Sequence, residues 1–358
     1  MTLHDLLTAQ PILGTGEAPV ELTGLASQRF SYLTTPSGSA APTPEILQVG
    51  ESEGDSHWRI SVPAGASHLP GQTATSTEPG ALLAAVDPAT DFTGYRPVWA
   101  DQLYQPRLAE PAQARTMRRI NGRRVRPLYI FGTDQRRVYY DTSYPWRCVG
   151  KLYNSDGFMG SASLVWGNII VTAGHMVPWN SISAGSWWMR FVPDYYDGQS
   201  LLGAGVESYV SDVQGYNTAV TGYDWAIGKL YTRLGDTLGY FGFNGASSDW
   251  DDQNWWTCAG YPIDVANAER PSWQGSISYH DTDGDSNGGF ELESQTADVN
   301  HGDSGGPLWA WWNGDPRVIG VVSGEEQEYQ FPFSTEDNNI FSSGSGFTNL
   351  IAWGRANW

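Results

Sequence analysis

Residues 300–308 read NHGDSGGPL, and this stretch decides how the rest of the chain is interpreted. Ser304 lies between small residues, and the neighbouring glycines let the backbone turn tightly enough to aim several N–H groups at one point. An acyl-transfer site needs such a turn. Because the chain holds 42 glycines, a lone GxSxG pattern would be a weak signal, but the whole hexapeptide GDSGGP is much rarer.

The positions of the histidines decide which serine chemistry the turn could serve. In a nucleophile-elbow hydrolase the histidine follows the serine, and no histidine lies after His301. His175 is the one that ends a suitable segment, because the apolar run 168–172 leads through two small residues into it. A buried strand that ends this way holds an imidazole on the floor of a cleft. Between the two motifs, Asp224 precedes another strand-like run.

The order His175, Asp224, Ser304 is that of the chymotrypsin clan. VTAGH, which ends at His175, resembles the histidine motif of that clan, and DWAI, which begins at Asp224, resembles its acid motif. GDSGGP matches its serine motif without a mismatch. Over roughly residues 128–358 the chain therefore resembles a chymotrypsin-fold serine endopeptidase. Three further stretches make it most similar to the glutamyl-endopeptidase-like branch of bacteria and fungi, namely residues 131–136, 144–147 and 150–152.

The resemblance implies an all-β fold of two six-stranded antiparallel β-barrels with the active site between them, preceded by an amino-terminal pro-region. Short β runs separated by turn signals fit this architecture. The expected domains are a pro-region over residues 1–124, a first barrel over 125–239 and a second barrel over 240–358. We expect strands near residues 149–152, 161–165, 168–171, 187–192, 225–230, 255–259, 273–279, 290–294, 307–312 and 318–322, and a helix over 348–355.

The resemblance also gives each motif residue a role. Ser304 would be the nucleophile, and His175 would act first as its base and then as the acid that protonates the leaving amine. Asp224 would fix the tautomer of the imidazole. The N–H groups of Gly302 and Ser304 would form the oxyanion hole. Asp303 needs a cation because an unpaired buried carboxylate is costly, and a new amino terminus and an arginine both remain open.

The specificity pocket is expected along residues 298–301, 322–325 and 344–346, again from the resemblance. Asp298 matches the position of the acid that binds arginine or lysine in trypsin-like members, and Glu325 would add a second negative charge. We therefore expect a basic P1 residue, although the similarity to the glutamyl branch points to acidic substrates. The expected substrate-binding residues are Asp298, Val299, His301, Ser323, Gly324, Glu325 and Ser345.

The first third of the chain differs in composition from the rest. Of the 17 tryptophans only Trp58 and Trp99 precede residue 146, and six arginines gather within residues 115–126. A cluster of arginines at such a boundary is a solvated linker, a nucleic-acid arm or a processing site. We favour processing within residues 118–126, so that the protein is made as a zymogen and its own pro-region is one of its partners.

The formal net charge of −19 at pH 7 argues against binding to nucleic acid or to an anionic membrane surface. No apolar run approaches the roughly 20 residues that cross a membrane, and residues 1–7 lack the basic and apolar regions of a secretory signal. The near absence of lysine, which is limited to Lys151 and Lys229, nevertheless favours secretion. We expect a secreted monomer that acts on protein or peptide substrates and requires no cofactor.

Cys148 and Cys258 could form one disulfide that joins the two barrels. The bond would close a loop of about 110 residues and stabilise the fold by roughly 4 to 5 kcal/mol before strain is subtracted. Two buried free thiols are the alternative.

Residues 281–287 read DTDGDSN and alternate oxygen ligands as a calcium loop does. Asp281, Asp283, Asp285 and Asn287 are the candidate ligands. An EF-hand would require glycine in sixth place and glutamate in twelfth, where this chain has Ser286 and Leu292. The sequence therefore favours a hairpin tip.

Two other functions stay open at this point. A catalytically inactive chymotrypsin-fold module could bind a partner or a glycan, and its usual mark, the loss of a triad member, is missing here. An esterase could use the same three residues.

Overall fold

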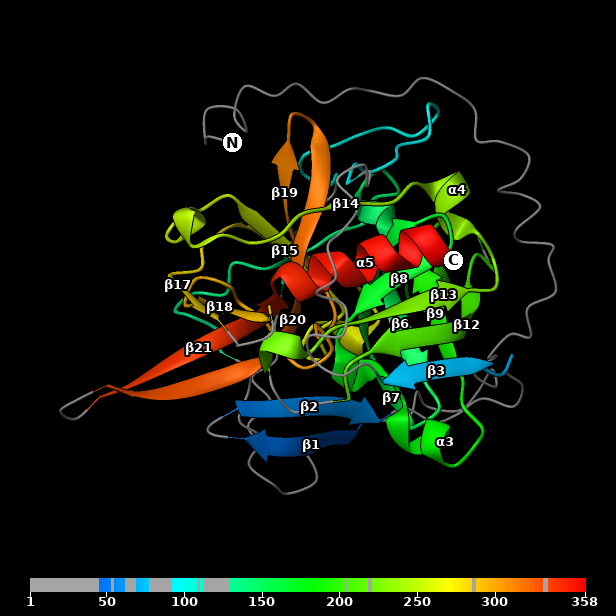
Figure 1. The fold of residues 1–358 in the computed structure, drawn as a ribbon. Coiled ribbons are helices and arrows are strands. Elements are labelled where there is room, and N and C mark those ends of the chain that lie inside the picture. The colour runs from blue at the N-terminus through cyan, green and yellow to red at the C-terminus, as the bar shows by residue number, and fades with distance from the viewer. Residues whose placement is uncertain are drawn as a thin grey trace.

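The computed structural model describes residues 45–52, 55–61, 69–76, 92–107, 110–112, 129–203, 205–217, 221–284, 288–330 and 334–358, and in 45–61 it describes the backbone. Strands dominate these ranges, and the long helix α5 (Ser345–Asn357) lies across the body of the molecule (Figure 1). No helix in the described ranges is long and apolar enough to cross a membrane.

Six antiparallel strands close into the first barrel. They pair in the cyclic order β6, β7, β8, β13, β12, β9, and β9 pairs again with β6. The predicted chymotrypsin-like all-β fold is thereby confirmed. The bounds are β6 (Val149–Asn154), β7 (Phe158–Trp166), β8 (Ile169–Thr172), β9 (Met189–Pro193), β12 (Ser208–Gly215) and β13 (Ala226–Leu230).

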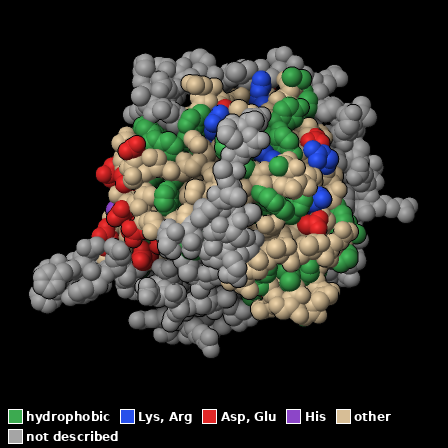
Figure 2. Space-filling view, viewed as in Figure 1, with side chains coloured by type: hydrophobic (Ala, Val, Ile, Leu, Met, Phe, Trp, Pro, Cys, Tyr) green, Lys and Arg blue, Asp and Glu red, His purple; other side chains and the backbone are tan. Residues whose placement is uncertain are grey.

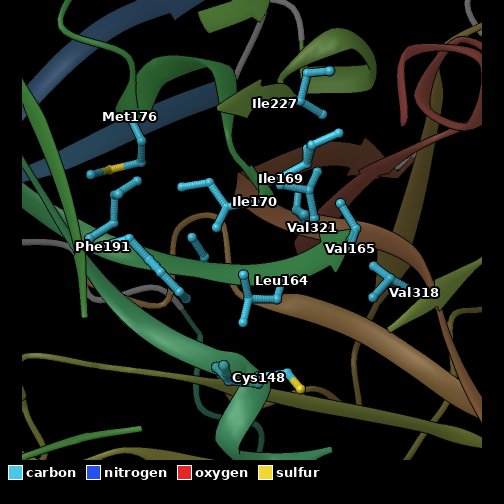
Figure 3. Close-up of a cluster of buried hydrophobic side chains, with 14 of the residues drawn as sticks. Cys148, Leu164, Val165, Ile169, Ile170, Met176, Phe191, Ile227, Val318 and Val321 are labelled. Carbon is cyan, nitrogen blue, oxygen red and sulfur yellow. The ribbon is translucent and has the colours of Figure 1, made fainter. Parts of the chain in front are cut away.

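Strand β8 shows why these segments form strands. Its four residues are all β-branched and all buried, which suits a pleated surface packed on both faces. Ile169 and Ile170 lie in one apolar cluster with Leu164 of β7 and Phe191 of β9 (Figure 3). Because β8 is fixed on both edges and both faces, the turn that follows it has a defined position.

The second half of the chain forms a second sheet in the order β16, β15, β19, β20, β21, β18. Among the described residues no ladder joins β16 to β18, but the hydroxyls of Ser294 and Thr296 donate to the carbonyl of Ser278 at 2.6 and 2.8 Å. These side-chain hydrogen bonds connect the end of β16 with the end of β18, where a sixth ladder would be needed to close a barrel. The bounds are β15 (Trp256–Gly260), β16 (Ser272–Ile277), β18 (Phe290–Ser294), β19 (Pro307–Trp312), β20 (Asp315–Gln330) and β21 (Ser334–Ser343).

Shorter elements connect these strands. The helices are α3 (Trp179–Ser183) and α4 (Leu234–Leu238), and the 3-10 turns are η1 (Trp146–Cys148), η2 (Gly174–Met176), η3 (Thr221–Tyr223), η4 (Ser248–Trp250) and η5 (Ala266–Ala268). The remaining strands of this part are β5 (Arg137–Val138), β10 (Tyr195–Tyr196), β11 (Gln199–Ser200), β14 (Gly242–Phe243) and β17 (Asp281–Gly284).

The described parts of residues 1–124 do not form a unit of their own. Strand β3 (Thr73–Ser76) adds to β12, and β4 (Glu110–Pro111) adds to β5. Ala100 is fully buried in the main apolar cluster, and the carbonyl of Leu103 accepts a hydrogen bond from Trp146 Nε1 at 3.0 Å. Residues 92–107 therefore pack into the main apolar cluster and bond to the chain that precedes the first barrel. The expected cleavage segment, residues 118–126, lies outside the described residues.

The predicted disulfide is wrong, since Cys148 and Cys258 are both free and buried. Cys148 belongs to the apolar cluster around the first barrel, where its Sγ lies 4.0 Å from the carbonyl of Leu238 (Figure 3). Cys258 belongs to the separate cluster of the second sheet. Each thiol faces its own core, and burial raises the pKa of both thiols.

We expect reducing agent to leave the melting temperature of the protein unchanged, because no disulfide constrains the unfolded chain. Differential scanning calorimetry with and without dithiothreitol checks this, with alkylation of the denatured protein as a count of its thiols. Fewer than two alkylated thiols, or a melting temperature that falls by several degrees on reduction, would contradict the free thiols.

Candidate active site

His175 lies in η2, immediately after β8, and two hydrogen bonds fix it to Asp224. The Nδ1 of His175 lies 2.6 Å from Asp224 Oδ2, and the backbone N–H of His175 donates to Asp224 Oδ1 at 2.8 Å. Asp224 is fully buried just before β13, the neighbour of β8 in the barrel. With Nδ1 facing the carboxylate, the imidazole carries its proton there and leaves Nε2 as the basic nitrogen.

Ser323 of β20 completes the surroundings of Asp224. Its hydroxyl donates to Asp224 Oδ2 at 2.7 Å, so one carboxylate oxygen accepts from both the imidazole and a hydroxyl. Because Ser323 comes from the second sheet, this contact joins the two halves of the molecule. Hydrogen bonds to the ionised form favour the carboxylate.

The serine turn, residues 300–306, packs against the same end of the first barrel. The carbonyl of Ser304 accepts the N–H of Ser161 on β7 at 2.8 Å. Gly305 has a φ of +81°, and a Cβ built on it would lie 2.8 Å from the nitrogen of Ala173, two residues before His175. Only glycine allows this approach. Ser304 and His175 therefore stand on adjoining turns, and both side chains are buried.

The backbone of the serine turn presents two N–H groups that its own folding leaves unused. Within the described ranges neither Gly302 nor Ser304 donates a backbone hydrogen bond. The carbonyl of Gly302 instead accepts the hydroxyl of Ser161 at 2.7 Å, which fixes the orientation of that peptide plane. Two such amides in a buried turn can stabilise an oxygen on which negative charge develops.

Asp303 has an arginine as its cation. Arg136 Nη1 lies 4.0 Å from Asp303 Oδ2, and the same guanidinium binds Asp264 at 2.6 Å and Asp134 at 2.9 Å. The carboxylate of Asp303 also accepts the N–H of Asn300 at 2.9 Å, and this bond closes the serine turn. Burial raises the pKa of Asp303 from 3.8 to about 7, although Arg136 and Asn300 act in the opposite direction. Of the two cations left open by the sequence, the described structure uses the arginine.

Asp298 does not face a substrate as we expected. Its Oδ1 accepts the N–H of Phe131 at 2.8 Å and its Oδ2 accepts the N–H of Gln135 at 2.7 Å. The carboxylate is buried, and burial raises its pKa even though both N–H groups lower it. Both oxygens thus hold residues 131–135, and this use of the carboxylate weakens the geometric case for a basic P1 residue.

Other expected pocket residues are distributed differently from the sequence prediction. Val299 belongs to the apolar cluster of the second sheet, and His301 is buried with its carbonyl accepting the N–H of Ile263 at 2.7 Å. Ser345 is exposed at the start of α5. In the sheet, Gly324 and Glu325 pair with Ile340 and Asn339 of β21.

Asn339 of β21, the ladder partner of Glu325, is a residue that the sequence prediction missed. It is fully buried, and its Nδ2 donates to the carbonyls of Tyr129 and Ala297 at 2.8 and 2.7 Å. Its Oδ1 accepts the N–H of Tyr129 at 3.1 Å. Residue 129 is thus held against β21 by an asparagine 210 positions away.

A hollow of about 560 Å³ lies next to the residues that support Asp298 and Asp303. Aromatic rings line much of it, and it shares Gln135, Arg136 and Gln274 with the network that holds Asp298 and Asp303. His175, Asp224 and Ser304 do not line it. The hollow is therefore adjacent to the support of the site and is not the site itself.

The candidate calcium residues lie at the outer edge of the second sheet. Asp281 and Asp283 are exposed on β17, and one carboxylate oxygen of each lies within 4.8 Å of one from the buried Glu293. Acidic side chains gather at this edge in Figure 2. Residues 281–284 form the strand β17 and pair with β18, so they are one arm of a hairpin and not the tip that the sequence favoured. Asp285 and Asn287 lie outside the described residues.

Residues 136–332, more than half of the chain, match the trypsin family. The chain belongs to the trypsin family. This trypsin-family chain is 27% identical over 183 residues to the glutamyl endopeptidase of Bacillus licheniformis. The match covers 50% of the chain and 54% of that protein, so the chain spans about half the length of this curated relative.

A solved structure shows the same fold. The structure of a Glu endopeptidase in complex with MPD superposes on the trypsin-family chain with a TM-score of 0.50 at 20% identity. It covers 64% of this chain and 100% of the other. At this identity the likeness concerns the fold alone.

Proposed function

We propose that this chain is a serine endopeptidase that hydrolyses peptide bonds through an acyl-enzyme on Ser304. The observation that carries the proposal is the pair formed by His175 Nδ1 and Asp224 Oδ2 at 2.6 Å, on a turn that adjoins the serine turn. Membership of the trypsin family supports it.

In this mechanism Ser304 Oγ attacks the carbonyl carbon of the substrate while His175 Nε2 takes the hydroxyl proton. The oxygen of the tetrahedral intermediate receives hydrogen bonds from the N–H groups of Gly302 and Ser304. His175 then gives its proton to the leaving amine, and an acyl-enzyme remains on Ser304. Water attacks this acyl group while His175 takes a proton from the water, and His175 returns that proton to Ser304 Oγ as the acid leaves. Asp224 stabilises the imidazolium and stays ionised throughout.

The proposal does not include a basic P1 residue. Asp298 already accepts two backbone N–H groups, so its carboxylate serves to hold residues 131–135 rather than standing ready for a substrate cation. The likeness to glutamyl endopeptidases suggests an acidic P1 residue as the alternative. Cleavage of a peptide library by the active protein decides between them.

Export and zymogen formation belong to the same proposal. The acidic, lysine-poor sequence favours a secreted protein, and the arginines of residues 115–126 are suited to processing by another protease. Two other functions remain as alternatives, a binding module without activity and an esterase. The buried hydrogen bonds of Asp224 favour an enzyme, since a binding module has no need of an oriented imidazole.

A fluorophosphonate probe tests the proposal directly. Ser304 Oγ should displace fluoride from phosphorus, with His175 taking the proton, so that one phosphonyl group per chain is found on Ser304 by peptide mass spectrometry. The Ser304→Ala variant should show no label. The experiment is run on the full chain and after limited proteolysis within residues 118–126. Absence of label in both would support the binding module, and label with ester but no peptide hydrolysis would support the esterase.

A further inference from the structure

The amino-terminal hairpin lies across the candidate active site. Its strands are β1 (Glu45–Ser52) and β2 (Asp55–Ser61), which pair antiparallel along their length. Strand β2 also pairs antiparallel with β20, through Ser56 and Glu325, and with β7, through Ile60 and Met159. Figure 1 shows the hairpin beside the base of the β20–β21 arm and next to β7. One short strand thus touches both halves of the molecule.

The two segments that β2 joins lie on opposite sides of Ser304. On one side, Glu325 comes two residues after Ser323, whose hydroxyl binds Asp224. On the other side, Met159 comes two residues before Ser161, whose N–H binds the carbonyl of Ser304 at 2.8 Å. From residue 56 to residue 60 an extended chain covers about 13 Å. Residues 57–59 therefore bridge the gap in which the serine and histidine turns meet.

This is the placement that a substrate requires. A peptide whose carbonyl carbon is to be attacked must be extended and held on both sides of the nucleophile, and pairing with exposed strand edges does so without regard to side chains. The register puts Trp58 midway between the two pairings, two residues from Ser56 and two from Ile60. The backbone at Trp58 and Arg59 is thus the part of β2 that the register centres on Ser304.

We propose that β2 occupies the substrate cleft as a substrate-like strand, so that residues 55–61 are an intramolecular inhibitor of the enzyme. The inference rests on the proposed function and names the regulation of the same site. A tethered strand competes with substrate at a millimolar effective concentration, whatever the concentration of the protein. Strand β1 adds to this grip because it pairs with β2 at seven positions and keeps it extended.

The position of Arg136 agrees with this form of control. In a protease whose Asp303 equivalent awaits a new amino terminus, the serine turn would lack its cation before processing. Here Arg136 lies 4.0 Å from Asp303 in the intact chain, and the turn is already closed by Asn300. A site that is assembled before cleavage needs another means of remaining inactive, and a strand in the cleft provides one.

The test uses the full chain and the rate at which a fluorophosphonate labels Ser304. Ile60→Pro removes a backbone N–H and adds a ring where β2 meets β7, so the strand should leave the cleft and labelling should become at least ~10-fold faster. Thr73→Pro is the matched control, because β3 is also an amino-terminal strand but pairs with β12, which contributes no residue to the site. It should label at the parental rate.

A second variant covers the case in which Ile60→Pro does not fold. A recognition site for a specific protease is inserted within residues 62–68 and cut after folding, which converts the tethered hairpin into a separable one. Labelling should accelerate on cutting, and the synthetic peptide DSHWRIS, residues 55–61, should slow it again at millimolar concentration.

Three outcomes are distinguishable. Faster labelling of Ile60→Pro and of the cut chain supports the inhibitory strand. If the parent is fully labelled and both variants are labelled at the parental rate, the inhibitory strand is overturned and the proposed function stays intact. No labelling of Ser304 in any form overturns the proposed function, and the inhibitory strand with it.

Discussion

Replacing Asp224 with asparagine is expected to lower kcat about 10⁴-fold, which is the magnitude that the same substitution has in another protease of this family. Asp224 receives three hydrogen bonds, from the ring and the backbone of His175 and from the hydroxyl of Ser323. An amide in this position keeps the shape of the side chain. It replaces one accepting oxygen by a donating NH₂ group.

The loss follows from the tautomer of His175. If the asparagine NH₂ faces Nδ1, that nitrogen must accept, and the imidazole proton moves to Nε2. A protonated Nε2 cannot remove the proton of Ser304. Affinity for substrate should change little, because Asp224 is fully buried and has no access to the cleft. The expected effect is therefore on kcat with KM nearly constant.

Steady-state kinetics on a peptide ester and a peptide amide measure this effect. Asp197→Asn serves as the control, since Asp197 is half exposed in an ion pair with Arg270 and should leave kcat unchanged. The loss should shrink at high pH, where hydroxide can replace the missing base. A pH-independent loss of less than tenfold would show that Asp224 does not orient the catalytic base.

The pair of His175 and Asp224 could be predicted from sequence because both residues end or begin short buried strands. The run of β-branched residues in β8 predicts a strand, and the small residues after it predict the turn that carries the histidine. The ladder of β8 with β13 then brings Asp224 alongside. The local patterns and the resemblance of the two motifs identified the residues, and the strand pairing that brings them together comes from the structure.

The orientation of Asp298 could not be predicted in the same way. Its partners are backbone N–H groups of Phe131 and Gln135, which lie 167 and 163 positions earlier in the chain. The motif predicts where the carboxylate lies in the sequence, but it does not predict which segment of the chain donates hydrogen bonds to it. The position of the β1–β2 hairpin could not be predicted for the same reason. The composition of residues 45–61 does not indicate a partner, and β2 pairs with the distant strands β7 and β20.

Replacing Arg136 with methionine should destabilise the protein by about 3 to 5 kcal/mol near pH 8, the usual cost of removing one partner from a buried ion pair. The guanidinium is almost fully buried among Asp134, Asp264 and Asp303, and methionine fills part of its volume without its charge. The serine turn should suffer as well, since Asp303 holds the N–H of Asn300. We expect at least a 10²-fold fall in kcat/KM, comparable to the loss of an oxyanion-hole donor.

The effect should depend on pH in a direction that follows from Asp303. Its pKa in the folded protein is about 7 and its ordinary value is 3.8, so between these values the folded chain holds a proton that the unfolded chain has lost. Stability therefore falls as the pH rises from about 4 to 7. Without Arg136 the pKa of Asp303 should rise further, and the fall should continue to higher pH. The deficit of the variant should be smaller near pH 5 than near pH 8.

Urea unfolding of the parent and of Arg136→Met between about pH 5 and pH 8 checks the sign. Arg270→Met is the matched control, because Arg270 makes an equally short ion pair with Asp197 but both side chains are nearly half exposed. Such a pair is worth at most about 1 kcal/mol, and its loss should be nearly independent of pH over this range. If Arg136→Met behaved like Arg270→Met, Arg136 would not be the cation that holds Asp303 and the serine turn. The intact chain would then still require a new amino terminus, and the argument that its site is assembled before processing would fail.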